Sequence, residues 1–280
     1  GTGGAGLAVL TEASSSPSLA AMRASFENTF PKATWTEWEP ITGDNAREGT
    51  RAAFGAPRTV RSSLVHAKII VCLDADPLGR DDASTRLSRE WADNRRVDAA
   101  DPSKQQLSRL YAVEGALSIT GMMADERLAM RPSDVGSIAA AIANHLGLEG
   151  GHATVGDDDK AIVEAMLADL DANHGSSIVM AGEGQPVAVH ALVAAINEKL
   201  GNVGSTVTYA TDATPNRMQA LEVLTGAMTN GSVKTLLLLG GNPLYDAPAD
   251  FNFAEALRKV GLSVHLSLYR NETSHACSWS

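Results

Sequence analysis

The sequence predicts an α/β fold made of two related lobes, each a mainly parallel sheet flanked by helices. Short β-branched or aliphatic runs alternate with amphipathic segments along the whole chain, and this alternation is typical of parallel strands joined by right-handed helical crossovers. One run, KIIVCL at residues 68–73, is almost entirely apolar, as expected of a strand covered on both faces. A repeated pair of segments indicates that the α/β pattern occurs twice.

Four strands are expected in the first half of the chain, at residues 7–10, 34–38, 68–73 and 110–114. The helix expected over 17–30 follows three serines and begins with Pro17, whose fixed φ suits the first turn of a helix. Further helices are expected near 44–54 and 81–96, and Pro132 opens another. The apolar residues of that last helix recur at helical spacing and predict its buried face: Val135, Ile138, Ile142 and Leu146.

A glycine-rich stretch, GLEGGHATVG at residues 147–156, is the most linker-like part of the sequence. We therefore expect the first lobe to span residues 1–148 and the second to span 149–280. Three aspartates at 157–159 favour a helix start, since acidic side chains suit the positive end of a helix dipole. Strands are expected at 177–180, 206–209, 235–239 and 262–268, separated by helices near 185–200, 215–229 and 250–260.

Two pairs of segments resemble each other within the chain. KIIVCLDADPLG at residues 68–79 matches KTLLLLGGNPLY at 234–245, since each has a lysine, an apolar strand, a small or acidic turn and Pro-Leu. LYAVEGALSITGMMAD (110–125) and LSVHLSLYRNETSHAC (262–277) each have a strand followed by a loop with a threonine, Thr120 or Thr273. These matches favour two lobes of related topology, and chance similarity between buried strands is the alternative.

The composition excludes several classes of protein. With 23 Lys and Arg against 33 Asp and Glu the formal net charge is −10, and the absence of a basic run argues against nucleic acid as a partner. No run of 18 apolar residues occurs, so direct membrane insertion is not expected. Cys72 and Cys277 are the two cysteines and cannot by themselves hold an iron–sulfur cluster or a thiolate zinc site. The seven histidines show no metal-ligand spacing, and no motif identifies a catalytic residue.

Glycine-rich turns follow two of the expected strands and supply the candidate cofactor-binding residues. Ligands of parallel sheets bind beyond the carboxyl ends of the strands, where glycine lets backbone N–H groups approach a phosphate. The candidates are Gly182, Glu183, Gly184, Gly240, Gly241 and Asn242. A tight strand–helix connection explains the same residues without a ligand.

Asp74 and Asp76 occupy the corresponding turn in the first half of the chain. Two carboxylates would repel a pyrophosphate, but they suit a general acid–base pair or Mg²⁺ ligation. As turn and helix-cap formers before Pro77 they also need no function.

Longer motifs in the chain resemble a known superfamily. MADERLAMRP at 123–132, followed by Ser-Asp and an Ala-rich helix, is similar to the "AD…LP-I-RPG-S/T-D" segment of the molybdopterin-guanine-dinucleotide oxidoreductases. IVMAGEG (178–184) and AINEKLGNVG (195–204) resemble the second dinucleotide lobe of that superfamily. LLLGGNP (237–243) resembles its "GxNP" turn, and VHLSLYRNETSHA (264–276) its "D-x-F-x-T-E-T-A" run.

One divergent branch is closer. The segments GLAVLTEASSSPSLAAMRASFENTFPKATWTEWEPIT, CLDADPLG, SRLYAVEGALSITGMMADERL and GGNPLYDAPADFNFAEAL resemble the large iron–sulfur subunit of alternative complex III. That subunit is also described as a Tat-variant-translocated molybdopterin oxidoreductase or an iron–sulfur-cluster-containing hydrogenase. The resemblance covers nearly the whole chain. The absence of an initial Met and an end inside the last motif lead us to expect a fragment of a longer polypeptide.

The resemblance implies a non-catalytic, molybdopterin-oxidoreductase-like module that acts as a scaffold for an iron–sulfur module in a membrane-associated quinol:electron-acceptor respiratory complex. Its partners would be the iron–sulfur module of the same polypeptide, a c-type cytochrome and membrane quinol-oxidising subunits, on the periplasmic side of the cytoplasmic membrane. No cofactor is expected in this segment, because the clusters would lie in the C-terminal module. No N-terminal cysteine motif or molybdenum-ligand segment is recognisable, and Asp74 and Asp76 replace an uncharged turn.

Two other functions stay open. In one, the chain is a genuine molybdopterin-dinucleotide-binding fragment of an oxidoreductase, and the glycine-rich turns contact molybdopterin guanine dinucleotide. In the other, it is a free-standing nucleotide-binding protein.

Overall fold

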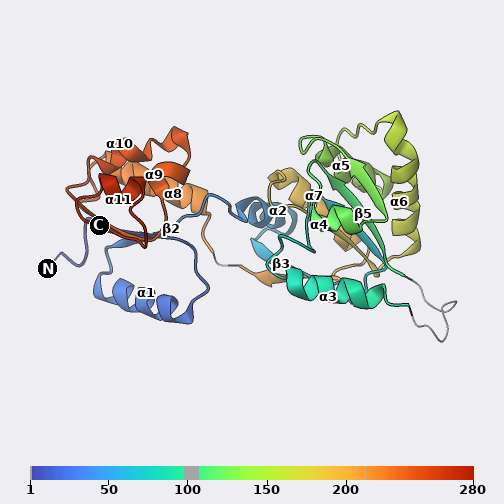
Figure 1. Cartoon of the computed structure of the whole chain (residues 1–280), viewed down its shortest axis with the longest axis horizontal. Coiled ribbons are helices and arrows are strands. Elements are labelled where there is room, and N and C mark those ends of the chain that lie inside the picture. The colour runs from blue at the N-terminus through green and yellow to red at the C-terminus, as the bar shows by residue number, and fades with distance from the viewer. Residues whose placement is uncertain (1, 98–106, 213) are drawn as a thin grey trace. The chain divides into compact units, whose positions relative to one another are not determined.

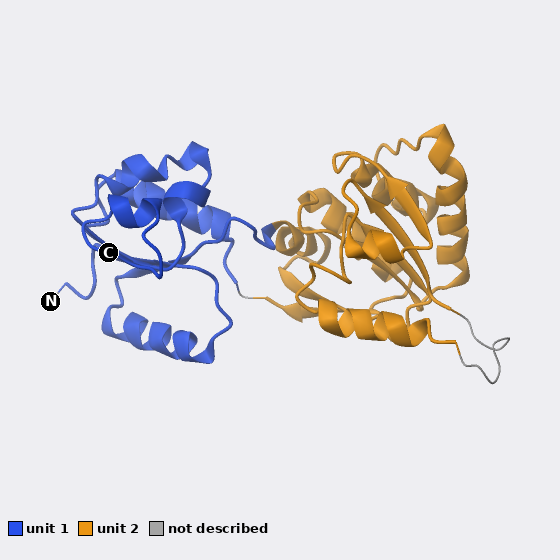
Figure 2. Cartoon of the chain, in the orientation of Figure 1, with its two compact units in different colours: residues 1–44, 214–280 blue, residues 45–213 orange. Residues whose placement is uncertain are grey.

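The chain folds into two compact units joined by two connections (Figure 2). A computed structural model describes residues 2–97, 107–212 and 214–280. Unit 1 combines residues 1–44 with 214–280, and unit 2 is the continuous segment 45–213 between them. Both units are α/β with parallel sheets flanked by helices, so the predicted fold class is confirmed.

The sheet of unit 1 has the strand order β10-β9-β1-β2, with all neighbours parallel. Its strands are β1 (Leu7–Thr11), β2 (Thr34–Glu37), β9 (Thr235–Leu239) and β10 (Leu262–Leu266). The helices of this unit are α1 (Pro17–Thr29), α8 (Arg217–Thr229), α9 (Pro243–Asp246), α10 (Phe253–Leu257) and α11 (Glu272–Ala276). Figure 1 shows α1 on one side of this sheet and the other four helices on the opposite side.

The sheet of unit 2 has the order β6-β5-β4-β7 and is also parallel throughout. Its strands are β4 (Ile69–Leu73), β5 (Arg109–Glu114), β6 (Glu126–Ala129) and β7 (Ser177–Ala181). A separate antiparallel ribbon pairs β3 (Arg58–Ser62) with β8 (Val207–Thr211). The helices are α2 (Asp44–Phe54), α3 (Ser84–Asn94), α4 (Ile119–Met123), α5 (Val135–His145), α6 (Lys160–Ala172) and α7 (Val187–Lys199).

Every residue of β4 is buried, as its continuous apolar run predicts. One face of its sheet packs against α5, α6 and α7, and the other packs against α3 through Leu87 and Trp91. Val135, Ile138 and Ile142 of α5 are fully buried, as predicted. Leu146, the fourth residue of the predicted stripe, lies just after the helix and is partly buried against the same core. These two layers of helices fix the carboxyl ends of the strands.

The division into units does not follow the boundary expected between residues 148 and 149. β7 belongs to unit 2 because it pairs with β4, with Ile69 opposite Ser177. β1 in turn lies between β9 and β2 in unit 1. The glycine-rich stretch 147–156 connects α5 to α6 inside unit 2. A linker-like composition therefore marked a loop, and strand pairing over long sequence distances set the units.

The repeated segments lie in different units and have the same pairing. Ile69 of β4 is opposite Arg109 of β5, and Thr235 of β9 is opposite Leu262 of β10. The lysine before each first strand and the Pro-Leu after it fall at equivalent places in these pairings. The strand on the other side of each first strand differs in chain order. In unit 2 it is β7, which follows β4 and β5 in the sequence, and in unit 1 it is β1, which precedes β9 and β10.

Two short strands were not expected from the sequence. β3 is mostly exposed and carries two arginines, so it has no apolar signal. β6 contains a single buried residue, Leu128. The strand expected at 206–209 is present as β8, but it forms the antiparallel ribbon instead of joining a parallel sheet.

Candidate functional site

In unit 2 the cofactor candidates Gly182, Glu183 and Gly184 follow β7. The turn with Asp74 and Asp76 follows the neighbouring strand β4, so both turns lie at the same edge of the sheet. Gly182 packs directly on the next strand turn: its N–H donates to the carbonyl of Leu73 at 2.9 Å, and a Cβ at this position would overlap the carbonyl oxygen of Asp74. The glycine is therefore required by contact between two backbone segments. Glu183 and Gly184 are exposed, and a Cβ on Gly184 would meet no described atom within 4 Å.

Asp74 stands in the left-handed region with a φ of 58°, which is uncommon for a residue other than glycine. The buried Gln185 donates from Nε2 to Asp74 Oδ2 at 3.1 Å and to the carbonyl of Pro132 at 3.3 Å. Gln185 Oε1 is buried without a partner among the described residues. The Asp74 carboxylate thus helps to join three loops of the strand-end edge.

Asp76 accepts two hydrogen bonds from Thr120 at the start of α4. The N–H and the hydroxyl of Thr120 both donate to Asp76 Oδ1, at 3.0 and 2.6 Å. Thr120 Oγ1 in turn accepts the N–H of Leu78 at 3.1 Å. The carboxylate that sequence reasoning considered for acid–base work or Mg²⁺ therefore bonds to the protein itself.

Glu114 at the end of β5 forms a buried ion pair that sequence reasoning missed. Its side chain is 5% exposed and lies 2.6 Å from Nε of Arg127 on β6. The hydroxyl of Ser118 also donates to Glu114, at 2.6 Å. Burial of a carboxylate is tolerated only when such partners compensate for lost hydration. The two residues are 13 positions apart, and only the pairing of β5 with β6 brings them together.

In unit 1 the Gly240–Gly241 turn follows β9. Both glycines have positive φ, 79° and 74°, and a Cβ on Gly240 would lie 2.7 Å from a carboxylate oxygen of Glu12. Left-handed backbone favours glycine on its own account. The presence of glycine here is explained by the turn and by the packing of Glu12.

Asn242 uses its side chain for contacts within unit 1. Its Oδ1 accepts the N–H and the hydroxyl of Thr273 at 3.2 and 2.8 Å, and its Nδ2 donates to Glu272 at 2.6 Å. The hydrogen bond from Asn242 lowers the pKa of the Glu272 carboxyl. The N–H of Leu244 donates to Thr273 Oγ1 at 3.1 Å.

The two turns are built in the same way. Asp76, Thr120 and Leu78 of unit 2 make the bonds that Asn242, Thr273 and Leu244 make in unit 1. A second equivalence lies nearby, where the N–H of Leu110 donates to Asp125 and the N–H of Ser263 donates to Ser278. These contacts support a duplication over chance similarity of strands.

Among the described residues, the remaining titratable groups do not assemble a reactive centre. Burial lowers the pKa of His190 and raises that of Cys72 far above its usual range, so the imidazole is neutral and the thiol unreactive near pH 7. His265 is buried, with Ser274 Oγ 2.9 Å from Nδ1. Within the described ranges no group of three or more His, Cys, Asp or Glu is arranged to hold a metal ion.

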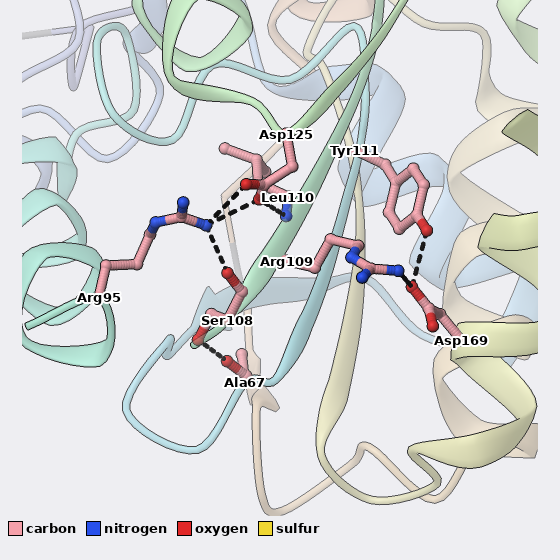
Figure 3. Close-up of polar contacts among 8 residues, drawn as sticks. All are labelled: Ala67, Arg95, Ser108, Arg109, Leu110, Tyr111, Asp125 and Asp169. Carbon is pink, nitrogen blue, oxygen red and sulfur yellow. Dashed lines mark hydrogen bonds and ion pairs between the residues drawn. The ribbon is translucent and has the colours of Figure 1, made fainter. Parts of the chain in front are cut away.

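A second polar cluster of unit 2 lies along β5 and is structural (Figure 3). Arg95 contacts both carboxylate oxygens of Asp125, at 2.9 and 2.8 Å, and so links the end of α3 to the start of β6. Asp169 of α6 accepts from Arg109 and Tyr111, at 2.8 and 2.7 Å. Burial, assisted by Asp169, raises the pKa of Tyr111 to about 12.

The candidate residues are thus divided between the two units, three in each. Gly182, Glu183 and Gly184 lie in unit 2, and Gly240, Gly241 and Asn242 lie in unit 1. Within each unit they lie at the carboxyl ends of parallel strands, as predicted. Of the described helices, none is long and apolar enough to cross a membrane.

No protein-family model matches the chain, and no curated protein matches it. Among solved structures it is similar to acetylene hydratase from Pelobacter acetylenicus, with a TM-score of 0.61 and 11% sequence identity. The match covers 96% of this chain and 48% of that protein, so the chain spans about half the length of this relative. At this identity the likeness is one of fold.

Proposed function

We propose that the chain is a non-catalytic, molybdopterin-oxidoreductase-like module of a respiratory complex that passes electrons from membrane quinol to an acceptor. The sequence motifs point to this branch. One observation supports a non-catalytic role: the side chains of Asp76 and Asn242, in the strand-end turns, each accept hydrogen bonds from a threonine of their own unit.

The residues do not fit the pyrophosphate of a molybdopterin dinucleotide. In unit 2 the turn after β4 presents the carboxylates of Asp74 and Asp76, so this edge is anionic. In unit 1 the carboxylate of Glu12 lies against Gly240. Anionic edges repel a pyrophosphate, and two of the glycines that would let one approach, Gly182 and Gly240, pack against the protein instead.

The role that suits such a module is that of a rigid scaffold. Electron transfer between cofactors needs fixed spacing, and the two sheets are held by buried cores and by ion pairs such as Arg127 with Glu114. The partners in this proposal are the iron–sulfur module of the same polypeptide, a c-type cytochrome and quinol-oxidising membrane subunits. The complex would work on the periplasmic side of the cytoplasmic membrane.

Elemental analysis of the purified native complex tests the proposal. We expect iron from the clusters and less than about one tenth of an atom of molybdenum or tungsten per copy of this chain. Quinol oxidation is expected to be unchanged when Gly184→Ala alters the one candidate glycine that faces open space. Molybdenum or tungsten near one atom per chain would overturn the proposal and favour the dinucleotide-binding alternative.

A further inference from the structure

One face of the unit-1 sheet is only half covered. The registers align Val264, Leu237, Val9 and Trp35 in one row across the four strands, so these side chains share a face. α1 covers the end of this row at β2, where the ring of Phe26 lies 5.5 Å from that of Trp35. None of the residues of α1 is buried, so this helix packs only loosely on the sheet. Among the described residues, no helix lies over the β9–β10 half of the face.

The equivalent half-face in unit 2 is completely buried. Its side chains are each at most 1% exposed beneath α5 and α6: Val71, Leu73, Tyr111 and Val113. Their counterparts in unit 1 are Leu237, Leu239, Val264 and Leu266. The first three are half-buried, and Leu266 is 70% exposed. Apolar side chains thus occupy matching positions in both units, but in the part of the chain that the structure describes helices cover them in unit 2 alone.

The outer edge of β10 is open in the same region. Trp279 makes the first pair on this edge, with its N–H bonded to the carbonyl of Ser263 and its carbonyl to the N–H of His265. In unit 2 the equivalent pair, Tyr111 with Glu126, is followed by three more along β6. Beyond Trp279, no residue of the described ranges bonds to the carbonyl of His265 or the N–H of Ser267.

A cavity of about 250 Å³ lies at this open edge, and its lining residues are His265, Ser267, Tyr269, Arg270, Ser274 and Ser280. Trp279 beside it is 69% exposed. An unpaired strand edge is a template for strand addition, and a contiguous exposed apolar surface marks an interaction site.

We propose that a strand followed by an amphipathic helix, supplied by polypeptide outside residues 1–280, docks on this surface. The strand adds parallel to β10 beside Trp279, and the helix crosses back over Leu237 and Leu239. Unit 2 provides the template, because β6 and α5 do this for β5 and β4. In unit 2 Val113, the counterpart of Leu266, pairs with Leu128. By analogy, the added strand places an apolar residue opposite Leu266. The inference does not depend on the proposed respiratory function.

Photo-crosslinking in the native complex tests this docking. Benzoylphenylalanine replaces Leu266, and in a matched control it replaces Val223, which is 64% exposed on α8. We expect position 266 to crosslink to one segment outside residues 1–280. Mass spectrometry identifies that segment, and its sequence is expected to show a strand pattern followed by an amphipathic helix pattern. Position 223 is not expected to reach that segment. Crosslinks from 266 to a second copy of this chain, or to lipid, would overturn the proposal.

Hydrogen exchange supplies a readout that needs no variant. The Ser267 N–H is expected to exchange at least tenfold more slowly in the native complex than in residues 1–280 alone, because a carbonyl of the added strand accepts its hydrogen bond. Equal exchange in both samples would overturn strand addition. The N–H of Leu236, inside the sheet, serves as the internal reference in both samples.

Discussion

Thr120 donates both its N–H and its hydroxyl to a single carboxylate oxygen of Asp76, and Thr273 makes the same pair of bonds to the amide oxygen of Asn242. An acid in one unit and an amide in the other play one role, so the negative charge is not what the turn requires. The requirement is an acceptor that holds the helix start against the strand turn.

Thr120→Val is expected to lower the free energy of unfolding by about 1–3 kcal/mol, because it removes a buried hydroxyl and leaves the N–H of Leu78 without its acceptor. Thr120→Ser keeps the hydroxyl and is the matched control, with a smaller loss. Urea unfolding followed by circular dichroism measures both. Thr273→Val repeats the test in unit 1, and a valine variant as stable as the serine variant would contradict the assigned role.

Gly182→Ala is expected to destabilise the protein by about 2 kcal/mol or more, since the added methyl group would overlap the carbonyl oxygen of Asp74 and backbone cannot easily yield. Gly184→Ala, two residues away, is expected to be neutral or slightly stabilising because its Cβ meets open space. Melting temperatures of the two variants make the comparison. Equal melting temperatures would show that the turn after β7 can shift to accept the methyl group.

Local patterns in the sequence predicted the strands and the site positions better than they predicted the units. The apolar run of β4 indicated a strand buried on both faces, and the matched threonines, Thr120 and Thr273, indicated a repeat. The boundary between the units depends on which strands pair, and β1 pairs with β9 across more than 200 positions. No local pattern carries that information.

The candidate site shows the same limit. Gly182 was singled out from its place after a strand, but its need for glycine comes from Asp74, which is far away in sequence. The buried pair of Glu114 with Arg127 was missed because its partners meet only through strand pairing. A glutamate at the end of an apolar strand gives no distinct signal of its own.

Replacing Asp74 by glycine is expected to cost less stability than replacing it by alanine. Both variants lose the bond from Gln185, but only glycine relieves the left-handed backbone, whose φ is 58°. We therefore expect Asp74→Gly to be more stable than Asp74→Ala by about 1 kcal/mol. At Asp82, an exposed residue without positive φ, alanine is expected to be at least as good as glycine. Chemical denaturation ranks the four variants, and the same ranking at both positions would argue against strain at Asp74.

His190 is expected to make the protein less stable in acid. Burial lowers the pKa of the folded-state imidazole below its ordinary value of 6.5, so below that pH the unfolded chain binds the proton that the folded chain excludes. Stability is then complete above pH 6.5 and falls as the pH drops toward the folded-state pKa. The free energy of unfolding, measured in urea at pH 7.5 and 5.5, is expected to fall less in His190→Gln than in the unchanged protein. His152→Gln, at an exposed position, is the control, and an equal fall in all three proteins would show that His190 is protonated readily in the folded state.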